Sequence, residues 1–221
     1  MIKIINRISL FVTIGIFFIF SNPSYAKVQL DKANSYIYQA SIAMTKGERD
    51  YYIDKACTEY QKAYNEDILN LDAIIGYGKT LAYKGERAEA KTILMQGYNT
   101  NPENPKIQAA LGDYNYIIQE YNNALEFYKL ALSSGYLKDY RTNLSTANCY
   151  EKLGDTKNAR LYYQITLMLN PGSIDAKKRL YKIDNMYQYN VNPDKPNIFD
   201  ETEDDENTDI NTIIEQCKDI K

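Results

Sequence analysis

The sequence repeats a pattern of small and apolar residues with a period of 34 residues, most clearly over residues 71–173. The period is kept through the fourth unit if one extra residue is allowed in the segment SSGYLKD. Two columns of small residues recur, the first with Gly78, Gly112 and Ala147, and the second with Ala90, Ala124 and Ala159. A chain with such a period buries its core by stacking similar units, so the period constrains the fold more than any single motif.

Each unit has the pattern of two helices joined by a turn. The first helix, of about 14 residues, carries the first small column, where a neighbouring helix crosses closely. A turn with glycine follows at Gly85 and Gly154. The second helix has Ala, then Leu or Tyr four residues later, then a small residue three after that, which is the spacing of one helical face. Pro102 and Pro171 end this helix, because proline cannot continue it.

These columns resemble the tetratricopeptide repeat (TPR) family over about residues 33–186. The resemblance implies an all-α fold, a right-handed α-solenoid of about four repeats closed by a capping helix with a polar outer face. The expected repeat domain is 27–186, with units at about 33–70, 71–104, 105–139 and 140–173 and a cap at 174–186. No Trp opens a unit, Gln119 replaces a turn glycine, and Tyr136 replaces a proline.

The first unit matches the pattern less closely than the others. Its segment TKGERDYY predicts a turn lengthened by about four residues, between helices at roughly 33–46 and 50–64.

The segment IIGYGKT, residues 74–80, ends like a phosphate-binding loop. Such a loop needs a further glycine at position 73 and a preceding strand. Position 73 is Ala73, and the repeat places the segment inside a helix. Gly78 therefore belongs to the helix-crossing column, and no nucleotide or other cofactor is expected.

The composition excludes several function classes. The 221 residues include no His, which removes Ser-His-Asp and Cys-His catalysis and most zinc sites. The net charge of −3 offers no basic surface for nucleic acid. Carboxylate pairs such as Glu86 and Glu89 have the spacing of solvated helix charges, so we expect neither an enzyme nor a metal site.

The first 26 residues have the pattern of a signal peptide. Lys3 and Arg7 precede the apolar run 8–20, and Ser24 and Ala26 fit a cleavage site after Ala26. Thirteen apolar residues are short for a membrane span, so we expect export to the periplasm or the medium of a bacterium. An uncleaved anchor in the inner membrane is the alternative.

The TPR resemblance also implies a concave groove, lined by the first helices, that binds a peptide or partner helix. Carried over to this sequence, the inward-facing positions include the candidate binding residues Ile75, Lys79, Tyr83, Lys106, Asp113, Tyr116, Ile117, Arg141, Leu144 and Asn148. Their charges are mixed, which disfavours capture of a carboxylate tail. Their tyrosines could anchor a partner or merely pack the superhelix.

The last residues, 187–221, form an expected disordered acidic tail, with six acids in the seven residues 200–206. A short amphipathic helix at 209–220 is expected within it, because Ile210, Ile213, Ile214 and Cys217 share one helical face. It could be inert, dock on a partner or return to the groove, and Cys217 could form an intermolecular disulfide.

The sequence thus predicts a non-catalytic scaffold or adaptor of the cell envelope that binds a protein or peptide. A membrane-anchored TPR assembly factor for a secretion or pilus-type complex is the alternative, and homo-oligomers remain open.

Overall fold

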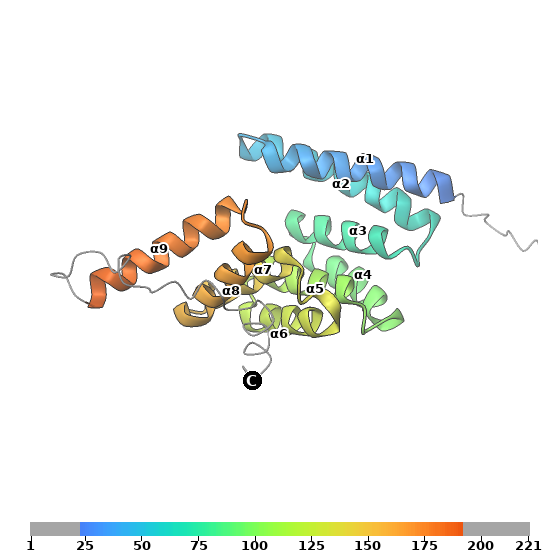
Figure 1. The fold of residues 1–221 in the computed structure, drawn as a ribbon. Coiled ribbons are helices and arrows are strands. Elements are labelled where there is room, and N and C mark those ends of the chain that lie inside the picture. Colours follow the sequence, from blue (N-terminus) through green and yellow to red (C-terminus); the bar gives the residue numbers. More distant parts are fainter. Residues whose placement is uncertain (1–22, 192–221) are drawn as a thin grey trace, which may run out of the picture.

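The computed structural model describes residues 23–191, which form nine α-helices and one π-helical turn without any strand in this range (Figure 1). The elements are α1 (Pro23–Ile42), α2 (Lys46–Glu66), α3 (Leu71–Lys84), α4 (Arg87–Thr100), α5 (Pro105–Ile117), α6 (Tyr121–Ala131), η1 (Leu132–Tyr136), α7 (Tyr140–Lys152), α8 (Thr156–Leu169) and α9 (Ile174–Val191). Helices α1 to α8 form four consecutive pairs, and each pair stacks on the next. This arrangement is a solenoid of helix pairs, with α9 at its C-terminal end.

The turns inside the second, third and fourth pairs share one geometry. Each contains a residue in the left-handed conformation, namely Gly85 (φ 87°), Gln119 (φ 68°) and Gly154 (φ 81°). In all three, the next amide donates to the carbonyl oxygen five residues back, at 2.8–2.9 Å. This hydrogen bond satisfies a carbonyl at the helix end, so the turn closes in the same way in each repeat.

The first helices of these pairs begin with side-chain caps. Asn70, Asn104 and Asp139 precede α3, α5 and α7, and each accepts a hydrogen bond from a backbone amide of the first turn. Such caps pair amides that have no partner inside the helix, which fixes where the helix begins.

The first pair differs from its expected boundaries. Helix α1 begins ten residues before the expected residue 33, and α2 begins at Lys46 rather than near residue 50. The segment TKGERDYY is therefore mostly helix, and the predicted lengthened turn is wrong. The reason is a capping arrangement in which Thr45 accepts from the Glu48 amide at 3.1 Å and Glu48 accepts from the Met44 amide at 3.3 Å.

The core lies between the two helices of each pair and between successive pairs. One cluster of buried apolar side chains extends from α1 to α5, and another joins α7, α8 and α9. Ala176 and Ile183 anchor α9 in the second cluster, while Arg179 forms an ion pair with Glu151 of α7 at 2.9 Å. Within residues 23–191, no helix is long and apolar enough to cross a membrane.

Two regions named by the sequence fall outside the described residues. Most of the expected signal peptide does so, although Pro23 to Ala26 already belong to α1. The amphipathic segment 209–220, with Ile210, Ile213, Ile214 and Cys217, lies wholly outside. The expected cap begins at Ile174, and the helix continues past residue 186 to Val191.

Replacing the left-handed Gln119 by glycine should stabilise the protein. A side chain with a Cβ atom is strained in this conformation, whereas glycine is not. Relief of a left-handed strain of about 1–2 kcal/mol is partly offset by the greater freedom of glycine in the unfolded chain, so we expect Gln119→Gly to raise the free energy of unfolding by about 0.5–1 kcal/mol in urea titrations. The reciprocal control, Gly154→Gln, should lower it by a similar amount; equal stabilities of all three proteins would show that the turn carries no strain.

Candidate functional site

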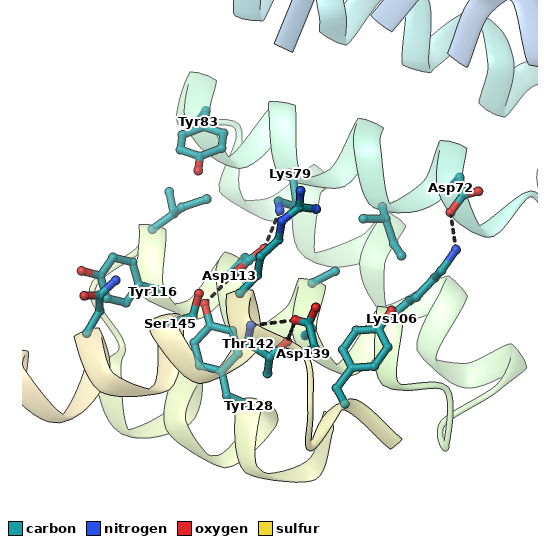
Figure 2. A pocket seen from close by; sticks show the side chains of 17 residues that line it. Asp72, Lys79, Tyr83, Lys106, Asp113, Tyr116, Tyr128, Asp139, Thr142 and Ser145 are labelled. Carbon is teal, nitrogen blue, oxygen red and sulfur yellow. Dashed lines mark hydrogen bonds and ion pairs between the residues drawn. The ribbon is translucent and has the colours of Figure 1, made fainter. Parts of the chain in front are cut away.

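The first helices of the repeats line a continuous groove. A cavity of about 580 Å³ lies against α3, α5 and α7 (Figure 2). Its wall contains Asp72, Ile75, Lys79, Tyr83, Lys106, Ala109, Ala110, Asp113, Tyr116, Ile117, Tyr128, Tyr136, Asp139, Arg141, Thr142, Ser145 and Asn148. A second cavity of about 610 Å³ lies between α1 and α3 and shares Asp72, Ile75, Lys79 and Tyr83 with the first. The groove therefore passes from the first repeat to the fourth.

Tyrosines of the second helices reach this groove beside small residues of the first helices. At Gly112 of α5, an added Cβ would lie 2.5 Å from the Tyr128 ring, so only glycine leaves room for that ring. The Tyr128 hydroxyl donates to Asp113 Oδ1 at 2.7 Å. In the next repeat, the Tyr163 hydroxyl donates to Asn148 Oδ1, also at 2.7 Å. Hydrogen bonds from the second helix of a repeat thus position side chains that its first helix presents to the groove.

Two ion pairs connect neighbouring repeats across the groove surface. Lys79 Nζ lies 2.5 Å from Asp113 Oδ2, and Lys106 Nζ lies 3.2 Å from Asp72 Oδ1. Each pair joins residues 34 positions apart, which is one repeat period, and Figure 2 shows both pairs as dashed lines. The Lys79–Asp113 pair is the more buried, since its side chains are 34% and 27% exposed against 53% and 64% for Lys106 and Asp72.

The local environment sets the charge states of the first pair. Burial alone would lower the pKa of Lys79, but the adjacent Asp113 carboxylate outweighs it, and the pKa of Lys79 lies above its ordinary value. Burial and the same carboxylate raise the pKa of Tyr128 far above its usual range. Asp113 therefore accepts hydrogen bonds from a charged lysine and a neutral tyrosine.

Aromatic side chains lie at the end of the groove formed by the C-terminal halves of α3 and α5. Tyr83 is 56% exposed. The half-buried Tyr116 packs edge-on against Tyr121, with ring centroids 5.4 Å apart and planes at 65°. Burial raises the pKa of Tyr116, so its hydroxyl is neutral at physiological pH. A partly open aromatic surface of this kind suits apolar side chains of a partner.

The structure brings nine of the ten candidate groove residues together on one cavity wall. The exception is Leu144, which is absent from that wall because its side chain packs against the cluster of α7, α8 and α9. Contacts alone do not test whether the other nine bind a partner, so that role stays a prediction.

Sequence reasoning missed five polar residues of the same wall, namely Tyr128, Tyr136, Asp139, Thr142 and Ser145. One signal for Tyr128 was present, because the gap left by Gly112 has to be filled by a large side chain of the second helix. Tyr136 and Asp139 belong to the loop with the extra residue, where the repeat pattern gives no direction for a side chain. Thr142 and Ser145 lie in α7, each one position after a predicted groove residue, and the carried-over positions did not include them.

The groove offers no visible site for a metal ion. No group of three or more Cys, Asp or Glu residues within 23–191 could hold one. Asp72 and Asp113 are paired with lysines, and Asp139 caps α7 by accepting from the Thr142 amide at 2.8 Å. These carboxylates therefore have structural roles.

Solved structures with the same architecture include those of MamA. One is 21% identical, covers 66% of this chain and 86% of its own, and has a TM-score of 0.51. MamA from Desulfovibrio magneticus RS-1 is 16% identical, covers 72% of this chain and 86% of its own, and has a TM-score of 0.52. YrrB, described as a TPR protein with an unusual peptide-binding site, is 20% identical, with 78% and 82% covered and a TM-score of 0.49.

No protein-family model matches the sequence, and no curated protein matches it. At the identities found among solved structures, the likeness shows the fold alone. The helical part of the chain is an all-α solenoid of helix pairs. Its fold is that of the tetratricopeptide-repeat proteins, which confirms the fold class predicted from the 34-residue period.

The Lys79–Asp113 pair should stabilise the stacking of two repeats. In a double-mutant cycle of Lys79→Met and Asp113→Asn, measured by urea unfolding, we expect a coupling energy of about 0.5–1 kcal/mol. The more exposed pair, tested with Lys106→Met and Asp72→Asn, should give a coupling near zero because water screens it. Equal couplings would contradict a special role for the buried pair.

The same cycle has an expected pH dependence. Because the pKa of Lys79 in the folded protein lies above its ordinary value of 10.5, the pair stabilises fully below that pH. Its contribution is lost only as the pH rises through the higher pKa of the folded state. Coupling energies at about pH 7 and about pH 9.5 should therefore agree. A decrease between these two values would mean that burial, rather than Asp113, dominates the pKa of Lys79.

Proposed function

We propose that this chain is a non-catalytic scaffold that binds a segment of a partner protein in the groove between α1 and α7. The observation that carries the proposal is the continuity of the two cavities, which share four residues of α3. A groove that passes across several repeats suits an extended peptide or a helix better than a compact small molecule. The repeat fold is consistent with this role, although fold alone does not decide function.

The chemistry of the groove favours a partner segment with apolar anchors and little net charge. Tyr83 and Tyr116 offer aromatic surface, and Ile75 and Ile117 add apolar side chains. Lys79, Lys106, Asp72 and Asp113 largely neutralise one another. Arg141 is exposed beside the Tyr140 ring and remains as a cation for a single acidic or carbonyl group of the partner.

Selection of binding peptides would test the groove before any natural partner is identified. A random-peptide display library would be panned on the purified protein, and the dissociation constants of selected peptides measured by titration calorimetry. We expect Tyr116→Ala to weaken binding at least about tenfold, as loss of an aromatic anchor does at other interfaces. Tyr51→Ala on α2, an exposed tyrosine outside both cavities, is the matched control.

If both variants bind selected peptides as tightly as the unmodified protein, the groove is not the binding surface. If both lose affinity alike, the peptides recognise exposed tyrosines in general.

The proposed place of action is the bacterial cell envelope. Its support is the sequence alone, with Lys3 and Arg7 before the apolar run 8–20 and small residues at Ser24 and Ala26. Cleavage after Ala26 would remove the first four residues of α1 and leave a helix that begins at Lys27. The buried Ala33 and Ala40 of α1 would remain in place.

The mass of the protein isolated from bacterial envelopes separates export from anchoring. Intact-mass spectrometry should give a chain that begins at Lys27, in the periplasmic or secreted fraction. A chain that retains residues 1–26 in the membrane fraction would contradict the proposal of cleavage. It would favour the alternative, an inner-membrane-anchored assembly factor for a secretion or pilus-type complex.

A further inference from the structure

Helix α9 stands where the first helix of a fifth repeat would begin, but no second helix follows it within residues 23–191. Tyr181 occupies the column in which earlier repeats have Gly78, Gly112 and Ala147. In those repeats the small residue allows the second helix to cross closely, whereas the Tyr181 side chain is 66% exposed. The face of α9 that a second helix would cover is therefore open.

The open face of α9 is apolar along its centre and basic at its edges. Ile174 is 67% exposed and lies two helical turns before Tyr181, on the same side of the helix. Lys177, Lys178 and Lys182 are exposed around them. Neither Lys177 nor Lys178 forms an ion pair with any residue in the described part of the chain. We call this set the α9 open face.

The sequence directly after α9 disfavours a second helix. One repeat after α8, it would cover about residues 190–204, which contain Pro193 and Pro196 and the start of the acidic run. Proline inside a helix removes a hydrogen bond and clashes with the preceding turn, so this stretch is a poor second helix. The next segment with a helical apolar face is 209–220.

We propose that the segment 209–220 docks as a helix on the α9 open face, in the place that the second helix holds in the earlier repeats. Its apolar face, with Ile210, Ile213 and Ile214, would cover Ile174 and Tyr181. The six acids within residues 200–206 complement the lysines at the edges of the open face. The docked helix would bury apolar surface and bring opposite charges together at the end of the solenoid.

The linker is long enough for this arrangement. The 17 residues from 192 to 208 span up to about 55 Å when extended. The 18 residues of α9 extend over only about 27 Å. The segment 209–220 can therefore reach any point along the open face in either direction.

The charges favour the α9 open face over the groove as the site for this acidic segment. In the groove, Lys79 and Lys106 are already paired with carboxylates of neighbouring repeats. A carboxylate brought there would meet Asp72 and Asp113 as well as the lysines. On α9, Asp175 is paired with Arg179 and Asp184 with Arg160, so Lys177 and Lys178 are cations of the open face that no carboxylate within residues 23–191 neutralises.

Disulfide trapping with the native Cys217 tests the proposal in the full chain. Three exposed tyrosines would be replaced one at a time, Tyr181→Cys on the open face, Tyr83→Cys in the groove and Tyr51→Cys on α2 as the control. Their exposed fractions, 66%, 56% and 55%, make them comparably reactive, and Cys57 and Cys149 are buried. After mild oxidation, the rate of each intramolecular disulfide would be measured by peptide mass spectrometry.

We expect Tyr181→Cys to form its disulfide with Cys217 at least about tenfold faster than either other variant, at a rate independent of protein concentration. Adding Lys177→Glu and Lys178→Glu should slow that rate severalfold, while circular dichroism shows unchanged helicity. A faster rate for Tyr83→Cys would place the segment in the groove. Equal rates of disulfide formation in the three variants would mean that the segment 209–220 docks on none of these surfaces. Disulfides that form only between two chains would assign the open face to a second copy of the protein. Each of these outcomes overturns the proposal.

Discussion

The stacking of this solenoid depends on one steric relation within each of its last three repeats. A small residue of the first helix, Gly78, Gly112 or Ala147, is followed 16 positions later by a large residue of the second helix. The Leu94 and Tyr128 side chains lie so close to Gly78 and Gly112 that a Cβ there would overlap them. This contact sets the distance between the two helices of a repeat, and that distance determines the shape of the groove.

A second relation acts between repeats rather than within them. The ion pairs Lys79–Asp113 and Asp72–Lys106 join equivalent helices one period apart. These residues shape the groove wall, and the more buried Lys79–Asp113 pair also stabilises the stacking of two repeats. Their mutual neutralisation leaves aromatic and apolar side chains as the distinctive chemistry of the groove, which is why we assign it an apolar rather than an acidic partner segment.

Most of the fold could be predicted from the sequence because the repeat makes each local signal recur. The positions of Gly85 and Gly154 predicted turns, and Gln119 adopts the same left-handed conformation even without a glycine. The first repeat was predicted less well, because the segment TKGERDYY was expected to be a lengthened turn although Thr45 and Glu48 cap a helix there. This capping arrangement places the start of α2 at Lys46 rather than near residue 50.

The groove could be predicted only in part, for reasons that lie in the packing. The inward-facing positions of the first helices were carried over from the TPR resemblance, and Lys79 and Asp113 were found in this way. Leu144 holds an equivalent position, but its partly buried side chain packs against the cluster of α7, α8 and α9 instead of lining the cavity. Tyr128 belongs to the other helix and reaches the groove only through the space beside Gly112. Such contributions depend on the distance between helices, which periodicity does not encode.

The tyrosine hydroxyls of the second helices, which donate hydrogen bonds to groove residues, have a consequence for how the binding preference of such a protein can change in evolution. Tyr128 and Tyr163 reach Asp113 and Asn148, whereas the second repeat has Leu94 at the equivalent position and no hydroxyl. An exchange of Leu and Tyr in this column of the second helices changes which side chains of the first helices accept a hydrogen bond, without altering any residue of the first helices. Binding preference can therefore evolve through the second helices as well as through the first.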